Sequence, residues 1–229
     1  MICFVFAMDK EATFLLDSYP HKQQQIGFAK YYECEGPHGK FAVLVSGIGK
    51  VFAGSALSAL LALKKDEIDG VINLGVGGSL NGEKAGLFSC LIGSAYLQHD
   101  LDTSPIGDPI GMVSGIDVIR FPGHEKLMEA VAKACAENGI GCENGTICSG
   151  DQFIAQEKQK EEILAKFEDA ISIDMESAAF AQVAYVYAVP YVAARFISDV
   201  NAPEEYHKNL PVCAQKLAIV AKWLINHIA

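Results

Sequence analysis

The chain has 229 residues, 51% of them hydrophobic, and a formal net charge of -10. This length and apolar content suit one α/β domain spanning residues 1–229. The acidic balance argues against nucleic acid and anionic membranes as partners, because both bind basic surfaces. No apolar run approaches the length of a membrane span, and the short apolar start lacks the basic leader of a signal peptide.

The seven cysteines are odd in number, scattered, and form no C-x-x-C pair. We therefore expect buried thiols in a reducing cytosol, not a disulfide framework or a zinc site. His99 and Asp100 are followed closely by Asp102, but no second histidine lies at metal-ligand spacing. The prediction is a cytoplasmic protein with no bound metal and no organic cofactor.

Strands and helices alternate along most of the chain, which predicts a mostly parallel or mixed sheet with helices on both faces. Hydrophobic patterns predict strands at 2–7, 24–34, 40–46, 70–74, 87–97, 145–148, 171–173 and 191–197. They predict helices at 11–16, after Lys50, and at 125–137, 156–166, 175–186 and 210–228. The helix after Lys50 is expected to bury a stripe on or near which lie Val51, Leu57, Leu60, Leu61 and Leu63. Residues 101–117 are rich in Gly, Pro and Ser and predict a long loop.

Charged residues recur where apolar strands end. Glu11 and Glu176 lie in or beside the first turns of predicted helices, and Asp199 follows the strand that contains Arg195. Each of these residues also has a purely structural explanation. A helix dipole favours a carboxylate in the first turn of a helix, which would account for Glu11 and Glu176. Asp199 can cap a helix, and Arg195 can pair with any of the acids. Ligands of open α/β sheets bind outside the carboxyl ends of strands, so the shared position favours a functional site.

Two glycine clusters do not match nucleotide-binding loops. A Walker loop is excluded because Leu44 and Val51 stand where it needs Gly and Ser or Thr. A dinucleotide fingerprint starting at Gly75 is excluded because Leu80 stands at its last glycine. The glycines still end apolar strands, where they serve either as tight turns or as places for close approach to a ligand.

Seven motifs in order resemble those of 5'-methylthioadenosine/S-adenosylhomocysteine nucleosidases, of the purine nucleoside phosphorylase superfamily. The motifs span residues 7–200: AMDKE from Ala7, SGIGKV from Ser46, NLG from Asn73 with Gly77-Gly78, His99-Asp100, SGDQFI from Ser149, DME from Asp174 and RFISDV from Arg195. The resemblance implies a single nucleoside phosphorylase-like domain, with a mixed central sheet flanked by helices, and usually a homodimer. It implies hydrolysis of the N-glycosidic bond of an adenosine that carries a 5'-thioether.

The resemblance also implies roles. Asp199 would be the general acid that protonates adenine N7, and Glu11 would deprotonate the attacking water. Glu176 would bind the ribose hydroxyls, while Arg195 would orient the water and the carboxylates. The remaining substrate-binding positions would be Met8, Ile48, Val76, Gly77, Phe153, Ile154, Met175, Ser198 and, as an aromatic lid, Tyr206.

The superfamily also contains phosphorylases, and the nucleophile must therefore be chosen. Only Arg120 and Arg195 are arginines among eighteen cationic residues, whereas a phosphate dianion favours several cationic donors. Three acids also repel phosphate, so hydrolysis is favoured. One departure is Val76, where the family commonly has Ser. A sibling hydrolase or phosphorylase with another nucleoside preference, and a non-catalytic nucleoside-binding module, stay open as alternatives.

Overall fold

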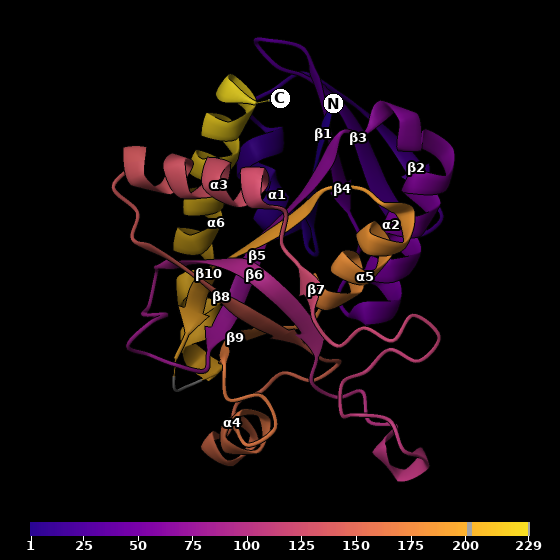
Figure 1. Ribbon diagram of the computed structural model, residues 1–229. Helices are drawn as coiled ribbons and strands as arrows, with labels where there is room; N and C mark the ends of the chain where they lie inside the picture. Colours follow the sequence, from indigo (N-terminus) through magenta and orange to yellow (C-terminus); the bar gives the residue numbers. More distant parts are fainter. Residues whose placement is uncertain (201–202, 229) are drawn as a thin grey trace.

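A computed structural model describes residues 1–200 and 203–228. Within these residues one sheet of ten strands runs through the molecule (Figure 1). Its strands are β1 (Ile2–Phe6), β2 (His21–Ile26), β3 (Ala29–Glu35), β4 (Lys40–Val45), β5 (Gly70–Ser79), β6 (Cys90–Gln98), β7 (Phe121–Pro122), β8 (Cys142–Ser149), β9 (Ala170–Asp174) and β10 (Tyr191–Asp199).

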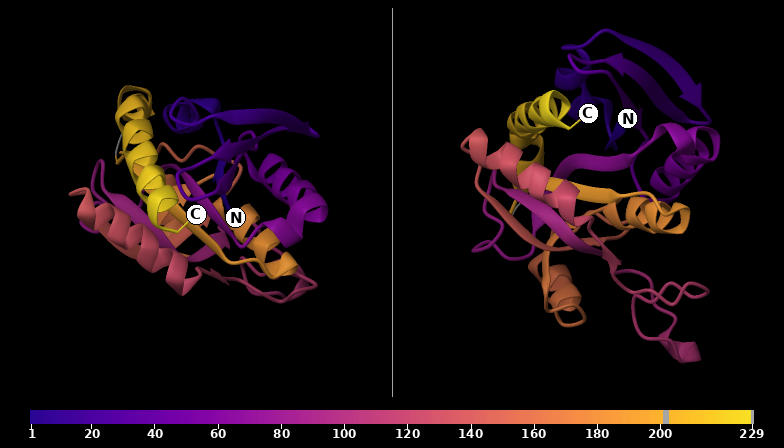
Figure 2. Two further views of the ribbon diagram at one scale, coloured as in Figure 1. Left: turned by 90° about the horizontal axis from the view of Figure 1, so that it is seen from above. Right: turned by 45° about the horizontal axis from the view of Figure 1, so that its top comes forward.

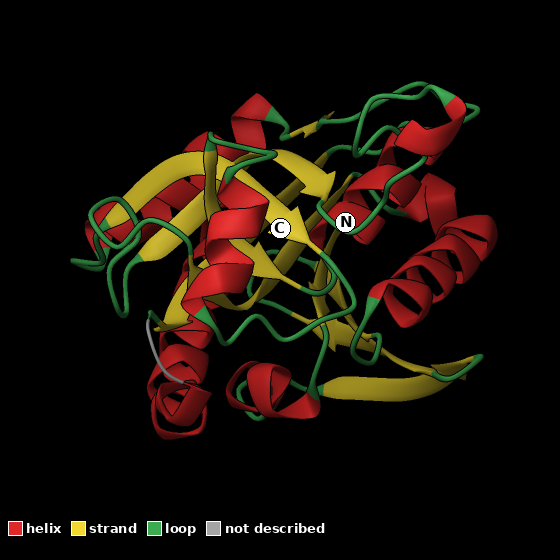
Figure 3. Cartoon of the chain, turned by 90° about the horizontal axis from the view of Figure 1, so that it is seen from below, coloured by secondary structure: helices red, strands yellow, loops and turns green. Residues whose placement is uncertain are grey.

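Helices cover the sheet on both sides. They are α1 (Asp9–Leu16), α2 (Lys50–Lys64), α3 (Glu125–Glu137), α4 (Glu157–Leu164), α5 (Ser177–Tyr187) and α6 (Pro203–His227), with short 3-10 turns η1 (Lys65–Glu67) and η2 (Ser104–Ile106). Figure 2 shows α3 and α6 on one side of the strands and α2 and α5 on the other, and the view from below shows the same layers (Figure 3). The predicted α/β fold with a mixed central sheet flanked by helices is confirmed.

Five strands close on themselves. The hydrogen-bonded order is β10-β6-β8-β9-β5, and β10 also pairs with β5, which completes the ring. From β5 the sheet continues through β1, β4, β3 and β2. The β5, β1, β4 and β10 strands are parallel, whereas β9 is antiparallel to β5 and β6 is antiparallel to β10. The closure brings the end of β9 against the end of β5, because Ile173 pairs with Gly78.

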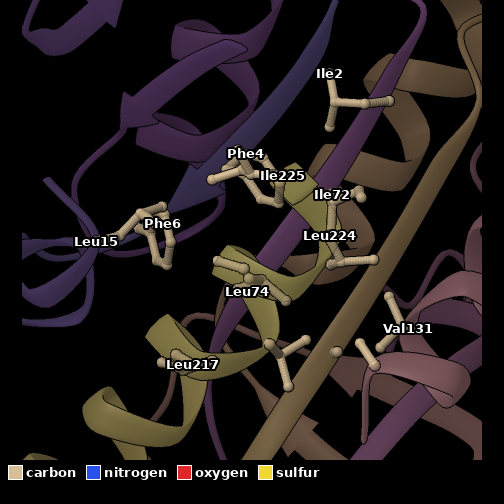
Figure 4. Packing of buried hydrophobic residues seen from close by; sticks show 14 of the residues in the cluster. Ile2, Phe4, Phe6, Leu15, Ile72, Leu74, Val131, Leu217, Leu224 and Ile225 are labelled. Carbon is tan, nitrogen blue, oxygen red and sulfur yellow. The ribbon is translucent and has the colours of Figure 1, made fainter. Parts of the chain in front are cut away.

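The central strands are buried on both faces, as an apolar strand beneath two helical layers must be. Side chains alternate along β1, so that Phe4 and Phe6 pack with α6 while Cys3 and Val5 pack toward α2 and α5. Figure 4 shows the first of these clusters, in which Phe4 lies beside Ile225 of α6 and Phe6 lies beside Leu15 of α1. These clusters on the two faces of the sheet hold in place the strand ends that carry the site.

Four predictions along the chain need correction. The strand predicted at 70–74 continues through the glycine segment to Ser79 as β5. The predicted strand at 24–34 is two strands, because Gly27 adopts φ 58° and turns β2 back onto β3. The stripe of α2 excludes Val51 and Leu63, which are 80% and 71% exposed; Ala53 and Ala56 accompany its three leucines. The last helix begins at Pro203, before the predicted start at 210, and tolerates Pro211 within it.

The segment 101–117 is largely a loop, as predicted, with η2 and an isolated bridge between Val113 and Val118. The α6 helix begins at Pro203, and residues 201 and 202 lie outside the described part of the chain. No helix in the described residues is long and apolar enough to cross a bilayer.

Candidate active site

Glu11 lies in the first turn of α1 and is only 2% exposed. Its Oε2 accepts hydrogen bonds from the backbone N–H groups of Ala7 (3.2 Å) and Met8 (3.0 Å). Its Oε1 accepts the backbone N–H of Val76 at 3.0 Å. Burial raises the pKa of Glu11, while these donors and the charge of Arg195 oppose the rise. The result is a buried carboxyl group that three backbone donors hold in one orientation.

Two glycines in the second half of β5 lie where the carboxyl groups approach the strand. A Cβ at Gly75 would lie 3.0 Å from Oε1 of Glu11, and a Cβ at Gly78 would lie 3.0 Å from Oδ2 of Asp199. Both glycines therefore permit close approach, the second of the two uses considered for these glycines.

Asp199 ends β10 beside an irregularity in its pairing with β5. The Ser198 hydroxyl donates to Oδ1 of Asp199 at 2.7 Å. Burial is the main cause that raises the pKa of Asp199, and the Ser198 hydrogen bond opposes it. The net rise favours a carboxyl group that keeps its proton to a higher pH than an exposed aspartate.

Glu176 lies at the N-terminus of α5, is 7% exposed, and accepts the backbone N–H of Gly49 at 2.8 Å. Burial and the neighbouring charge of Asp174 raise its pKa to about 8. Asp174 is the last residue of β9, and its Oδ1 accepts the backbone N–H groups of Glu176 and Ser177, both at 3.2 Å.

Arg195 is 1% exposed and lies behind the pocket wall. Its Nε donates to Oδ2 of Asp174 at 2.6 Å, and its Nη2 donates to the Asn73 side chain at the same distance. The sequence places Arg195 among the substrate-binding residues, but its side chain does not line the pocket. Its guanidinium group instead joins β10, β9 and β5, and its charge acts on Glu11 and Glu176.

The carboxyl groups open into one pocket of about 710 Å³, part of it open to solvent. Phe153, 45% exposed, meets Tyr206 edge-on with ring centroids 5.6 Å apart. The Tyr206 hydroxyl contacts the Met8 sulfur at 3.4 Å. Burial raises the pKa of Tyr206 to about 12, so its phenol stays neutral. Carboxyl groups beside aromatic and thioether walls can hold a flat polar ligand with an apolar substituent.

The structure brings twelve of the thirteen predicted site residues to this pocket, all except Arg195: Met8, Glu11, Ile48, Val76, Gly77, Phe153, Ile154, Met175, Glu176, Ser198, Asp199 and Tyr206. The prediction missed five lining residues: Ala7, Gly78, Gln152, Ile173 and Asp174. All of them except Ile173 lie within the seven motifs of the sequence analysis. Their place in these motifs could therefore have identified them as pocket residues.

His99 and Asp100 stay outside the pocket lining. Asp100 pairs with Lys50 at 2.5 Å and accepts the backbone N–H of Asp151 at 3.0 Å. Among the described residues, no group of three or more His, Cys, Asp and Glu side chains is arranged to hold a metal ion.

Comparison with known proteins places the chain in a protein superfamily. The sequence profile of the phosphorylase superfamily matches residues 1–226, so this chain is a phosphorylase-superfamily protein. A 5'-methylthioadenosine/S-adenosylhomocysteine nucleosidase of Haemophilus ducreyi is 31% identical over 90% of this chain and 88% of its own length.

Solved structures agree with this placement. The nucleosidase of the same name from Neisseria meningitidis, in complex with methylthio-immucillin-A, superposes with a TM-score of 0.92 at 28% identity, covering 99% of each chain. Futalosine hydrolase of Helicobacter pylori superposes with a TM-score of 0.91 at 26% identity, covering 99% of this chain and 97% of its own. By sequence the chain belongs to the family of 5'-methylthioadenosine/S-adenosylhomocysteine nucleosidases.

Proposed function

We propose that the protein hydrolyses the N-glycosidic bond of 5'-methylthioadenosine and S-adenosylhomocysteine, releasing adenine and a 5-thioribose product. The observation that carries this proposal is the convergence of Glu11, Glu176 and Asp199 on one pocket with aromatic and thioether walls. The family supports the choice of nucleoside, since the H. ducreyi relative bears the names of both substrates.

Asp199 is the general acid of the proposed reaction. Adenine leaves poorly as an anion, so its N7 takes the Asp199 proton while the electron pair of the C1'–N9 bond passes to the base. Burial raises the pKa of Asp199 and favours the protonated form that this step needs. The Ser198 hydrogen bond at 2.7 Å fixes the orientation of the carboxyl group.

Glu11 is the general base. It takes one proton from the water whose oxygen forms the new bond to C1', so that the proton given to adenine is balanced by one removed from water. The three backbone donors hold the carboxylate in one place and do not neutralise it. A base positioned in this way contributes on the order of a hundred- to ten-thousand-fold in rate.

Glu176 binds the ribose hydroxyls and faces the developing positive charge. The ribosyl transition state is oxocarbenium-like, so a buried carboxylate stabilises it more than the neutral ground state. Met175 packs on the sugar. Arg195 acts through the pocket wall by holding Asp174 and Asn73, without contact to the substrate.

In the proposed complex, different residues of the pocket contact the adenine end and the 5'-thioether end of the nucleoside. Phe153 stacks on adenine and the backbone of Ile154 reads its Watson–Crick edge. Met8, Ile48 and Tyr206 line the side of the 5'-thioether, where Tyr206 already contacts the Met8 sulfur. Val76 and Gly77 form the floor under the ribose.

Water is favoured over phosphate as the nucleophile. The described pocket lining has four carboxyl groups and neither Lys nor Arg. Lys50, the lysine of the second motif, is engaged by Asp100 at 2.5 Å and by Gln98 at 3.0 Å. Arg120 pairs with Asp169 on the surface. A phosphate dianion would meet carboxylates without the cationic donors that it needs.

Adenine release tests this function. The purified protein is incubated with 5'-methylthioadenosine, S-adenosylhomocysteine, adenosine and futalosine, each with and without phosphate, and the free base is measured. We expect phosphate-independent release of adenine from the two thioether nucleosides. A requirement for phosphate would make it a phosphorylase, preference for another nucleoside would make it a sibling hydrolase, and binding without release would make it a binding module.

We also propose a homodimer in the cytoplasm. The pocket residue Ile48 is 50% exposed and adjoins Val51, which is 80% exposed, and Phe28, 68% exposed, stacks on Phe52 at 4.5 Å. An apolar rim of this kind is typical of an interface. Light scattering should give twice the chain mass, and a Phe28→Glu variant should reduce the measured mass.

The seven free cysteines support the proposed cytoplasmic location, because thiols stay reduced in a reducing compartment. Cell fractionation checks this location.

A further inference from the structure

The chain just after Asp199 is held from two sides. The Lys160 ammonium of α4 donates a hydrogen bond to the carbonyl oxygen of Val200. Oε2 of Glu205, in the first turn of α6, accepts the backbone N–H of the same residue at 2.9 Å. Val200 therefore has both of its backbone polar groups bound by charged side chains from separate helices. This arrangement fixes the residue that directly follows the proposed general acid.

Lys160 is unusual for its helix. The α4 helix lies below β9 in Figure 1 and is mostly exposed, yet Lys160 is only 9% exposed. Its neighbour Lys158 has a side chain 82% exposed and pairs with Glu162 along the helix. Burying an ammonium group is costly unless it is bound, and the Val200 carbonyl binds this one. Lys160 does not line the pocket, so it does not touch a ligand there.

The positive charge of Lys160 also acts on the Asp199 carboxyl group. Burial raises the pKa of Asp199 most, the Lys160 charge lowers it and the Glu205 charge raises it. Tyr206 and Cys213 of α6 face Asp199 as well, but burial raises the pKa of each to about 12, so both are neutral near pH 7. Among the described residues, Lys160 and Glu205 are thus the two charges, opposite in sign, that act on Asp199.

We propose that Lys160 is a positioning residue for the general acid: it holds the carbonyl of Val200, the residue after the end of β10, and supplies the positive charge that faces the Asp199 carboxyl group. This inference rests on the proposed function for its catalytic meaning. Glu205 is the opposing partner, which holds the Val200 N–H and supplies the negative charge.

Substitution of Lys160 separates this role from a purely structural one. Lys160→Met keeps the aliphatic stem and removes the charge. We expect kcat to fall about tenfold, because a displaced acid transfers its proton poorly, and the alkaline limb of the pH–rate profile to move to higher pH. Lys160→Arg keeps the charge and should keep the limb in place. Lys158→Met, on the same helix, is the matched control and should change neither kcat nor the limb.

A measurement that needs no turnover keeps this inference independent of the proposed function. The carbon-13 shift of the Asp199 carboxyl group, assigned with an Asp199→Asn variant, is titrated in the unliganded protein. We expect the midpoint to rise in Lys160→Met and to fall in Glu205→Gln. The Glu205→Gln arm also tests the inference if Lys160→Met does not fold. Unchanged midpoints in the folded variants would overturn it, whereas shifted midpoints in a protein that releases no adenine would overturn the proposed function alone.

Discussion

The backbone N–H of Gly49 donates a 2.8 Å hydrogen bond to the Glu176 carboxyl group, across 127 residues of sequence. Gly49 precedes α2 with φ 94°, a left-handed conformation that favours glycine. The bond joins the start of α2 to the start of α5, so two helix N-termini face one carboxyl group. This carboxyl group is consequently oriented before any ligand arrives.

Glu176→Gln should change the pH dependence of stability. The pKa of Glu176 is about 8 against 4.5 for the free side chain, so the folded state prefers the protonated form. Its contribution is complete below pH 4.5 and is lost as the pH rises to about 8. Glutamine does not titrate. The variant should match wild type near pH 4.5 and exceed it by roughly 2–4 kcal/mol above pH 8.

Urea unfolding of Glu176→Gln and wild type at pH 5 and pH 8.5 checks this. A constant difference between the two proteins at both pH values would contradict it. At pH 8.5, where the wild-type Glu176 is ionised, adenine release by the same variant should be lower by on the order of a hundredfold or more, because the neutral amide does not stabilise an oxocarbenium ion.

Asp199→Asn removes the transferable proton and keeps the shape of the side chain. We expect adenine release to fall a hundred- to ten-thousand-fold, with a melting temperature close to that of wild type. In wild type the rate should decline as the pH rises through the raised pKa of Asp199, because the carboxyl group then loses the proton that it transfers. Near-normal release by a folded variant would remove Asp199 from its assigned role.

Arg195→Met should be strongly destabilising. The guanidinium group is paired with Asp174, and both side chains are 1% exposed. Removing one partner leaves a buried, uncompensated charge, which costs about 3–5 kcal/mol. Arg120→Met is the matched control, because the Arg120–Asp169 pair is 42% and 46% exposed and should contribute about 1 kcal/mol or less. Similar losses in both variants, measured by chemical denaturation, would argue against this account.

Gly75→Ala tests the close approach of Glu11 to the middle of β5. The added methyl group would lie 3.0 Å from Oε1 of Glu11 and 3.2 Å from Nη1 of Arg195. We expect a displaced base and a loss of roughly tenfold or more in kcat. Gly86→Ala is the control, since its nearest atom is the Gly82 carbonyl oxygen at 3.7 Å. Equal activity of the two variants would show that the contact is unimportant.

Val76→Ser restores the hydroxyl group common in the family. The Val76 N–H binds Glu11 through the backbone, so this bond survives the change. A new hydrogen bond to the ribose should lower KM by about fivefold, from roughly 1 kcal/mol of binding. Values of KM for thioether nucleosides and adenosine measure it. An unchanged KM would mean that the floor of the pocket does not contact the sugar.

Much of the architecture followed from local patterns. The helix at 125–137 was predicted with the bounds that α3 has, because its apolar residues repeat with helical spacing. The β2–β3 turn at Gly27 was missed, because β2 is exposed and polar and carries no apolar alternation. Val51 and Leu63 were placed inside because hydrophobicity alone does not show which face of α2 meets the sheet.

The site was anticipated through motif resemblance and through carboxyl groups at strand ends. The second argument assumed that the preceding strands end at one edge. The structure differs, since β9 is antiparallel to β5 and reaches the site because the sheet closes through β10. Arg195 likewise resembled a ligand-binding residue in the sequence, and only the packing of Asp174 and Asn73 against it placed it behind the pocket wall.

By itself, the sequence determined the fold class, the chemical types of the site residues and the strand ends on which they lie, because hydrophobic periodicity and motif order are local properties. The tertiary structure alone decided which carboxyl groups share a cavity, which carry raised pKa values and which charged residues stand behind them. Those outcomes depend on burial and on contacts between residues that are distant in the chain, and neither can be read from local sequence.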